Sequence, residues 1–335
     1  MTAGIANPLC VTMGDPAGVG PAMTIQAWKH LREDSENCFF VIGATDLYTH
    51  EIPVRQISDP SETAKTFPDA LPVLPVEEIP LPPPGHPDPQ TAPVITSSIK
   101  RAATYALTLQ ADAVITNPIN KALLYGAGFN HPGHTEYIAD ICSAATGKQL
   151  QPVMLLTGGG LRVALATIHI PHREVPDHLS IDKLVDLAGI VAASMQTDFG
   201  ITAPRIAFTG LNPHAGESGM IGREEIDIIN PAAEALRARG IDMSDACSAD
   251  TVFASALTGQ FDAVIAMTHD QGLIPVKTLD MWGGVNTTLG LPIVRTSPDH
   301  GTAYEAARTG TARADSLVAA IRLARTMADN RKRAS

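Results

Sequence analysis

Short apolar runs rich in Val and Ile alternate along this chain with segments of helical periodicity. The clearest apolar runs cover residues 38–44, 112–116, 161–170, 205–211 and 261–267. Runs of this length bounded by turn residues are typical of strands buried on both faces, and strands that alternate with helices pair mainly in parallel. The alternation therefore predicts an α/β protein built on a largely parallel sheet.

Two of the intervening segments predict helices. Residues 93–110 place apolar side chains near one face, namely Ile95, Ile99, Ala102, Ala103, Ala106 and Leu107. Residues 180–200 begin at Ser180, a preferred N-cap, and reach Gly200 just beyond the expected end. The Pro-rich stretch 79–93 suits neither a helix nor a central strand, so we expect a long surface connection there.

Length and composition favour a cytoplasmic globular protein. A chain of 335 residues that is 44% hydrophobic and 18% charged is long enough for a sizeable core and favours two domains. It contains no run of about 18 uncharged apolar residues, and its first residues lack the basic and long apolar regions of a signal peptide. We therefore expect neither a membrane span nor a secretory signal.

The net charge and the cysteines indicate which partners and which cellular compartment suit this protein. The net charge of −11 gives no general attraction to nucleic acid or to anionic lipid, which leaves a small, locally attracted anionic substrate as the charged partner. The four cysteines are far apart and form no C-x-x-C pair, which argues against a zinc knuckle or a disulfide framework. Scattered thiols suit a reducing compartment.

Three predicted strands deliver a histidine at or just past their carboxyl ends. These histidines are His169, His214 and His269. Ligands of open parallel sheets bind outside the carboxyl ends of the strands, and three imidazoles with a free fourth position suit a catalytic divalent metal. The alternative is that each histidine only satisfies a backbone group, since no H-E-x-x-H spacing is present. The pattern alone leaves both interpretations open.

Other segments predict an anion site. His134 and Thr135 stand at the expected start of a helix, where free amides favour a phosphate or a carboxylate. Lys277, Asn286 and Arg295 follow on a Gly-rich part of the chain, and together they would form a phosphate clamp. Each of these residues alone is equally compatible with a helix cap or a solvated surface position.

The Gly-rich stretch 11–21 invites a nucleotide-binding interpretation that its spacing does not support. Its glycines do not form G-x-G-x-x-G, and no G-K-[ST] follows. On spacing alone the stretch predicts a strand-to-helix turn.

Seven blocks, in order across nearly the whole chain, resemble the 4-hydroxythreonine-4-phosphate dehydrogenase family of vitamin B6 biosynthesis. They read GDPAGVGP, ITNPINKALL, PGHTEYIAD, LNPHAGESG, ADTVF, HDQGLIPVK and VNTTLGLPIVRTSPDHGTA. The resemblance implies two α/β/α domains of the isocitrate/isopropylmalate dehydrogenase-like fold, with a cleft between them, in a homodimer with shared active sites. It implies a discontinuous cofactor-side domain of residues 1–140 plus 286–335, and a dimerisation and metal-binding domain of residues 141–285.

The resemblance also implies roles for individual residues. The metal, which could be zinc, magnesium or cobalt, would be bound by histidines of both subunits, with His269 reaching across the dimer to His169 and His214. The phosphorylated substrate would be held by His134, Thr135, Lys277, Asn286 and Arg295. His134 and Lys277 are candidate proton acceptors, as is a water molecule, and Asp250 in ADTVF would lie close to the reacting end.

A cofactor segment follows from related β-decarboxylating dehydrogenases, which this chain resembles at HGTAYE. That resemblance implies that His300, Gly301, Thr302 and Glu305 contact NAD, with the Glu305 carboxylate accepting the ribose hydroxyls. The family usually continues with Ala-Gly, whereas this chain has Arg308 in place of the glycine. An arginine beside the ribose is compatible with the 2′-phosphate of NADP, although NAD is the expected cofactor.

The implied reaction is the NAD-dependent, metal-assisted oxidation of 4-phosphohydroxy-L-threonine to 2-amino-3-oxo-4-phosphohydroxybutanoate. That β-keto acid decarboxylates to 3-amino-2-oxopropyl phosphate in the synthesis of pyridoxal 5′-phosphate. One alternative is a sister dehydrogenase acting on 4-phosphothreonate or another phosphorylated hydroxy acid, or on an aromatic dihydrodiol. A second is a metal-dependent hydrolase that uses no dinucleotide.

Overall fold

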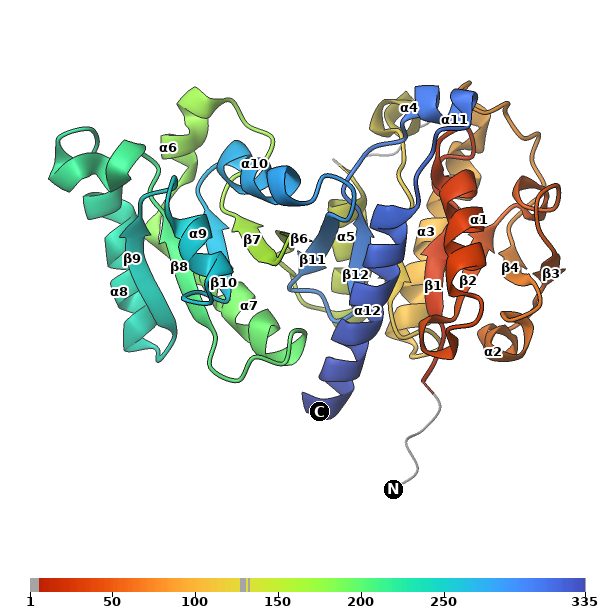
Figure 1. The fold of residues 1–335 in the computed structure, drawn as a ribbon, viewed down its shortest axis with the longest axis horizontal. Helices are drawn as coiled ribbons and strands as arrows, with labels where there is room; N and C mark the ends of the chain where they lie inside the picture. The colour runs from red at the N-terminus through yellow and green to blue at the C-terminus, as the bar shows by residue number, and fades with distance from the viewer. Residues whose placement is uncertain (1–5, 127–130, 132, 335) are drawn as a thin grey trace. The chain divides into compact units, whose positions relative to one another are not determined.

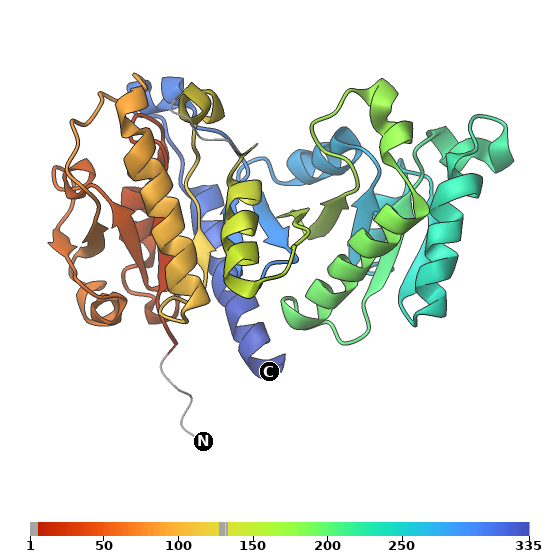
Figure 2. The ribbon, with the colours of Figure 1, turned by 180° about the vertical axis from the view of Figure 1, so that it is seen from behind.

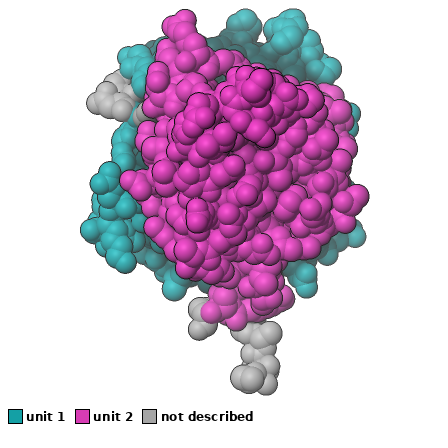
Figure 3. All heavy atoms as spheres, turned by 90° about the vertical axis from the view of Figure 1, so that its left-hand side faces the viewer, with its two compact units in different colours: residues 1–152, 291–329 teal, residues 153–290, 330–335 magenta. Residues whose placement is uncertain are grey.

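The chain forms two compact units, coloured separately in Figure 3. The computed structural model describes residues 6–126, 131 and 133–334. Unit 1 comprises residues 1–152 and 291–329, and unit 2 comprises residues 153–290 and 330–335. The chain thus passes between the units near Pro152 and Leu291, whereas the expected domain boundaries were 140/141 and 285/286. The cofactor-side and dimerisation roles of the two expected domains remain predictions.

The strands of unit 1 lie in the order β3-β4-β2-β1-β5-β12. Their bounds are β1 (Leu9–Thr12), β2 (Phe39–Gly43), β3 (Val54–Gln56), β4 (Leu71–Pro75), β5 (Val114–Ile115) and β12 (Arg295–Pro298). Neighbouring strands run parallel throughout this order. The Gly-rich stretch forms the turn between β1 and α1, as its spacing predicted.

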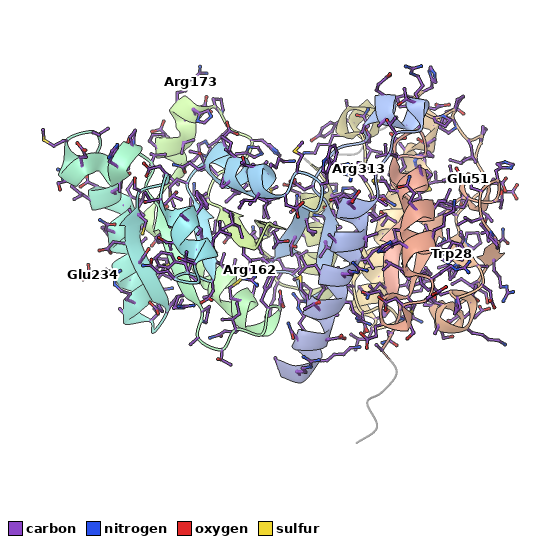
Figure 4. The ribbon with its side chains drawn as sticks, viewed as in Figure 1. Trp28, Glu51, Arg162, Arg173, Glu234 and Arg313 are labelled. Carbon is purple, nitrogen blue, oxygen red and sulfur yellow. The ribbon has the colours of Figure 1, made fainter. Side chains whose placement is uncertain are left out.

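Helices cover both faces of the unit 1 strands. The helices of this unit are α1 (Gly20–Leu31), α2 (Thr63–Thr66), α3 (Ala92–Leu107), α4 (Lys121–Gly126), α5 (His134–Thr146), α11 (Tyr304–Thr309) and α12 (Asp315–Ala334), and the last residues of α12 belong to unit 2. The short helices α4 and α11 lie beyond the ends of the strands (Figure 1). Figure 1 shows α1 and α12 over one face, and Figure 2 shows α3 and α5 over the other. The indole of Trp28, labelled in Figure 4, donates a hydrogen bond to the carbonyl of Phe67 at 2.9 Å.

The predicted apolar face of α3 is confirmed. Its members pack in the core between α3 and the strands, and Ile99, Ala102 and Ala103 are fully buried. The Pro-rich stretch before this helix is a connection up to Asp88, whereas Pro89–Thr91 forms a 3₁₀ turn that leads into α3. Proline is tolerated there because the first helical amides have no intrahelical acceptor.

The strands of unit 2 lie in the order β11-β6-β7-β10-β8-β9. Their bounds are β6 (Val153–Gly158), β7 (Leu161–Leu165), β8 (Arg205–Thr209), β9 (Asp242–Cys247), β10 (Ala263–Ala266) and β11 (Val285–Leu289). β6 is antiparallel to both β11 and β7, and the remaining neighbours are parallel. The prediction of a largely parallel α/β protein is confirmed.

Helices also lie on both faces of the unit 2 strands. They are α6 (Val175–His178), α7 (Ile181–Thr197), α8 (Asn230–Ala238), α9 (Val252–Leu257) and α10 (His269–Leu279). Figures 1 and 2 show α9 and α10 on one face and α7 and α8 on the other. Ser180 caps α7 by accepting a hydrogen bond from the amide of Lys183 at 3.3 Å, and Gly200 follows the helix with φ +69°, as expected.

One predicted strand is shorter than its apolar run. Residues 161–170 were expected to be extended, but β7 ends at Leu165. Beyond it, the hydroxyl of Thr167 donates to the carbonyl of Met267 at 2.6 Å, and the amide of Ile170 bonds back to the carbonyl of Ile168. The chain therefore turns away from the sheet before it reaches His169, which lies on a connection instead of in the strand.

Two further predictions from the composition concern membrane-spanning segments and the state of the cysteines. Within the residues that the structure describes, no helix is long and apolar enough to cross a membrane. All four cysteines are free, and Cys10, Cys38 and Cys142 are buried. Burial raises the pKa of the Cys142 thiol to about 11, so this thiol is protonated at neutral pH.

Candidate active site

The three strand-end histidines of unit 2 follow neighbouring parallel strands. β10 lies between β7 and β8 and is parallel to both, so their carboxyl ends form one edge. His169 follows β7, His214 follows β8 and His269 follows β10. Parallel pairing therefore brings segments that are about a hundred residues apart in sequence to the same edge of the sheet.

The polar residues after Met267 begin a helix. Thr268 is the N-cap of α10, and it forms a capping box with Gln271, whose side-chain oxygen accepts from the Thr268 amide at 3.1 Å. Because the cap fixes the first turn, His269 is held at the first position of α10. Its ring lies 5.6 Å from the ring of His169, centroid to centroid, with an interplanar angle of 45°.

This pair of rings fits a shared metal. A zinc–nitrogen bond is about 2.0–2.1 Å, which puts the centroids of two tetrahedral imidazole ligands roughly 5 Å apart. The 5.6 Å between His169 and His269 is close to that spacing. Nδ1 of His269 also lies 2.8 Å from Oδ1 of Asp270, an arrangement that leaves Nε2 of His269 for a metal.

Asp270 faces a second histidine as well. Nε2 of His172 lies 3.5 Å from the other carboxylate oxygen of Asp270. The hydrogen bond with His269 is the main reason that the pKa of Asp270 is below its usual range, and His172 acts in the same direction. Asp270 is therefore ionised at neutral pH and can hold the His269 ring in one orientation.

His214 does not join the other two histidines. Its side chain is exposed and lies 3.8 Å from the carboxylate of Glu217, in a 3₁₀ segment (Pro213–Gly219) where His214 itself has φ +52°. Among the described residues, no three His, Cys, Asp or Glu side chains form a group that could hold a metal ion. Two of the three candidate ligands, His169 and His269, are therefore adjacent in the part of the chain that the structure describes, and the third is not.

Three more candidates of the predicted site lie in unit 2. Lys277 is on α10, eight positions after His269, and Asn286 is on β11 opposite Leu156 of β6. Asp250 lies on the connection between β9 and α9, where it accepts a hydrogen bond from the Ser248 hydroxyl at 2.6 Å. Lys277 and Asn286 are therefore carried by α10 and β11, two elements that both adjoin β6.

The remaining anion-site candidates lie in unit 1. Arg295 begins β12, is only 3% exposed, and donates to the Thr116 hydroxyl at 2.6 Å. Burial lowers the pKa of this guanidinium to about 10, and the carboxylate of Glu136 partly offsets that effect. Arg295 consequently keeps its positive charge at neutral pH despite being buried.

His134 and Thr135 open α5, as predicted. Gly133 is the N-cap, with an extended backbone, and Nε2 of His134 is shielded from solvent without a hydrogen-bond partner among the described residues. The pKa of His134 is well below its usual value, first because the imidazole is buried and then because Arg295 and Lys121 are positively charged. A neutral imidazole with an unused nitrogen is therefore available beside two cations.

Sequence reasoning missed Lys121. This residue begins α4, directly after the strand-end segment TNPIN. Its Cε and Nζ lie 3.1 and 3.3 Å from the position that a Cβ on Gly133 would occupy. Lys121 stands in the block ITNPINKALL, but the resemblance assigned it no role.

Sequence reasoning also missed a contact between the Gly-rich turn and the HGTAYE segment. The Tyr304 hydroxyl donates to the fully buried carboxylate of Asp15 at 2.6 Å, and the Val19 amide donates to the carbonyl of Thr302 at 3.0 Å. A Cβ on Gly18 would lie 3.0 Å from that same carbonyl, so a larger residue would need the two segments to move slightly apart. The two motifs form one structural element of unit 1.

The predicted cofactor residues lie around the start of α11. His300, Gly301 and Thr302 precede the helix, and Nδ1 of His300 lies 3.0 Å from the carbonyl oxygen of Gly301. Glu305 is on α11, where its carboxylate accepts two hydrogen bonds from the guanidinium of Arg308, at 2.6 and 3.0 Å. The carboxylate expected to face a ribose is thus already paired with an arginine.

The chain matches a family model over residues 35–324, described as pyridoxal phosphate biosynthetic protein PdxA. A 4-hydroxythreonine-4-phosphate dehydrogenase of Caulobacter vibrioides is 48% identical, and the alignment covers 97% of this chain and 99% of that protein. The alignment with the Caulobacter protein covers almost the whole length of both chains.

Solved structures agree with the sequence relatives. A crystal structure of 4-hydroxythreonine-4-phosphate dehydrogenase from Klebsiella pneumoniae is 34% identical, with a TM-score of 0.82 over 96% of this chain and 100% of that one. A terephthalate 1,2-cis-dihydrodiol dehydrogenase from Burkholderia xenovorans is less similar, at 26% identity and a TM-score of 0.64, over 96% and 98% of the two chains. The predicted fold class is confirmed by the first of these likenesses.

Proposed function

The chain belongs to the pyridoxal phosphate biosynthetic protein PdxA family, and from this premise we propose that it oxidises 4-phosphohydroxy-L-threonine with NAD and the help of a divalent metal. The product, 2-amino-3-oxo-4-phosphohydroxybutanoate, would lose CO2 to give 3-amino-2-oxopropyl phosphate. The 48% identity to a 4-hydroxythreonine-4-phosphate dehydrogenase over nearly the full length carries this proposal. The chain is accordingly an oxidoreductase that acts on a CH–OH group.

The charges of unit 1 support a phosphorylated substrate. Arg295 is buried yet positively charged, and a phosphate would form charge-assisted hydrogen bonds with its guanidinium. His134 and Thr135 would add an imidazole and a hydroxyl at the first turn of α5, where the helix amides also favour an anion. We further assign Lys277 and Asn286 of unit 2 to the same substrate, on the strength of the resemblance.

The histidines supply the metal ligands in this proposal. His169 and His269 would bind the metal through ring nitrogens, His214 would complete the set, and Asp270 would orient His269. When bound, a divalent metal lowers the pKa of the substrate alcohol and stabilises the enolate charge that develops during loss of CO2. Zinc, magnesium and cobalt are all compatible with imidazole ligands of this kind.

A residue or a water molecule near the reacting carbon would accept the proton of the substrate alcohol. The alcohol proton must leave as hydride departs, so an acceptor must be uncharged or anionic at the working pH. His134 meets that requirement because its pKa is low, and Lys277 and a water molecule are the other candidates. Asp250 would lie close to the reacting end.

The HGTAYE segment would contact NAD, which accepts the hydride when bound. The contacting residues would be His300, Gly301, Thr302 and Glu305. Arg308 already pairs with the Glu305 carboxylate, and the same guanidinium could donate hydrogen bonds to the 2′-phosphate of NADP. On the strength of the resemblance, we propose NAD as the preferred cofactor and NADP as a tolerated one.

A homodimer with shared active sites is part of this proposal. Large apolar side chains are exposed on α10 and just beyond it, namely Ile274, Leu279, Met281 and Trp282. Such a concentration of exposed apolar residues suits a subunit interface. Since α10 also carries His269 and Lys277, an interface here would lie next to the proposed metal ligands. The acidic composition and free thiols support a cytoplasmic location.

The substrate proposal predicts NADH formation at 340 nm with 4-phosphohydroxy-L-threonine and divalent metal, at a rate well above that with 4-phosphothreonate. Both compounds offer a phosphate and a secondary alcohol, so the pair tests the finer substrate assignment within one chemical class. Faster turnover of 4-phosphothreonate would assign the chain to a sister activity instead. A dihydrodiol substrate is disfavoured, because the chain retains the cationic residues that a phosphate requires.

A metal-dependent hydrolase differs from this proposal in needing no dinucleotide. A ligand that binds the folded protein raises its melting temperature, so millimolar NAD gives a direct comparison. An upward shift is expected here, and its absence would favour the hydrolase.

Replacement of Arg295 predicts a selective loss of substrate affinity. Arg295→Ala should raise KM for the phosphorylated substrate by about ten- to a hundredfold while leaving KM for NAD nearly unchanged, because a charge-assisted hydrogen bond is worth about 1.5–3 kcal/mol. Steady-state assays that vary each substrate in turn provide the measurement. Equal increases in both KM values would show that Arg295 acts on the structure of unit 1 as a whole.

A further inference from the structure

We infer that Lys121 is a further substrate-binding residue, whose ammonium group contacts the anionic end of the substrate beside His134 and Arg295. The inference rests on the proposed function and extends it to a residue that the motif analysis did not select. Four observations, all within unit 1, carry it.

The first observation is the position of the Lys121 ammonium. Its Nζ lies 3.3 Å from the point where a Cβ on Gly133 would stand, and Gly133 is the N-cap of α5. The first amides of this thirteen-residue helix lack intrahelical acceptors and form a partial positive charge. The ammonium therefore adds a full positive charge at the end of α5 that already favours anions, and glycine at position 133 leaves room for it.

The second observation concerns His134. Its Nε2 is shielded from solvent and has no hydrogen-bond partner among the described residues, which is costly for a buried polar atom. The positive charges of Arg295 and Lys121 both lower the pKa of this imidazole, so both cations lie close to it. A ligand oxygen placed between the three groups would satisfy the orphaned nitrogen and neutralise the cations together.

The third observation is the local charge balance. The Oε2 of Glu136 lies 3.2 Å from the same point above Gly133, and its negative charge raises the pKa of Arg295. Lys121 adds a second cation to this group of charged side chains. A phosphate dianion could form charge-assisted contacts with both cations, and the loss of Lys121 would remove one of them.

The fourth observation is that the base of Lys121 is anchored. Asn120, the preceding residue, accepts a hydrogen bond from the Leu123 amide through its side-chain oxygen at 3.3 Å. This bond fixes the first turn of α4, so Lys121 leaves the backbone from a defined position, as a ligand-binding side chain requires.

The test uses inorganic phosphate as the probe, bound to the full-length protein and measured by isothermal titration calorimetry. Lys121→Met should weaken phosphate binding by about tenfold or more, and Lys121→Arg should restore most of it, because a charge-assisted contact is worth about 1.5–3 kcal/mol and about 1.4 kcal/mol corresponds to tenfold. Lys100→Met is the matched control: this lysine is exposed on α3, and its loss should leave phosphate affinity unchanged.

A spectroscopic measurement separates binding from a structural role. In two-dimensional NMR of the imidazole resonances, with His134→Gln for assignment, Lys121→Met should raise the pKa of His134, since a neighbouring positive charge is removed. A lysine that only stabilised α4 would change the melting temperature without moving that pKa.

The outcomes distinguish this inference from the proposed function. Wild-type phosphate affinity in Lys121→Met, or no phosphate binding by the wild type at millimolar concentration, would overturn the role of Lys121. The substrate assignment is tested independently by the NADH assay. Loss of phosphate binding in Lys121→Met together with no oxidation of either phosphorylated substrate would keep the anion site and reject the proposed reaction.

Discussion

Removal of divalent cations is expected to abolish NADH formation, and added Zn²⁺, Mg²⁺ or Co²⁺ is expected to restore it. The physical reason is that an unassisted secondary alcohol has a very high pKa, whereas a bound divalent metal lowers the pKa of an attached oxygen by several units. Dialysis against EDTA, followed by assay with and without each metal, measures the effect. The expected loss is to background, because a protein side chain carries at most one positive charge and cannot replace a divalent metal.

Direct binding gives this prediction a readout that does not depend on turnover. Isothermal titration with Zn²⁺ should show tight binding to the wild type and much weaker binding to His269→Ala. His178→Ala is a suitable control, since His178 ends α6 and belongs to no proposed site. Full activity of the metal-free protein would refute the metal proposal, and unaltered Zn²⁺ affinity in His269→Ala would remove this residue from the ligand set.

Features set by neighbours in sequence were predictable from the sequence. The apolar face of α3 and the Ser180 cap of α7 depend on residues three or four positions apart, and both are present as predicted. The same holds for the start of α5 at His134. Local hydrogen bonding and side-chain periodicity are enough to fix such features.

Features set by distant contacts were not predictable in this way. The bond between Tyr304 and Asp15 joins residues 289 positions apart, and no sequence motif connects them. β7 ends early because the hydroxyl of Thr167 bonds to Met267 of the neighbouring segment, which the apolar run 161–170 does not reveal. Lys121 was missed for the same reason, since its proximity to Gly133 comes from packing.

The sequence suggested three equivalent histidines, but the structure makes them unequal. His169 and His269 are neighbours within one chain, whereas His214 is exposed in a segment with left-handed backbone angles. The division that the resemblance implied, with His269 crossing to His169 and His214, remains a prediction. We propose one alternative, in which His169 and His269 of one subunit share a metal with His214 of the partner subunit, and mixed dimers distinguish the two divisions.

Each single variant, His169→Ala, His214→Ala or His269→Ala, should be inactive alone, because every site loses one ligand. In a hybrid of His214→Ala with His269→Ala, one composite site carries both lesions and the other carries none. Random mixing makes half of the dimers hybrids, and half of their sites are intact, so about one quarter of wild-type activity should return. The hybrid of His169→Ala with His269→Ala should stay inactive, since each of its sites lacks one member of the pair.

The pattern of recovery therefore identifies which ligand crosses the interface. Pairs of variants are unfolded and refolded together, hybrids are confirmed by differential tags, and NADH formation is measured. Recovery with His169→Ala plus His269→Ala, and none with His169→Ala plus His214→Ala, would instead show that His269 is the ligand that crosses. If verified hybrids of all three pairs stay inactive, the metal lies within one subunit, and His214 must then move to join the adjacent rings of His169 and His269 in its own chain.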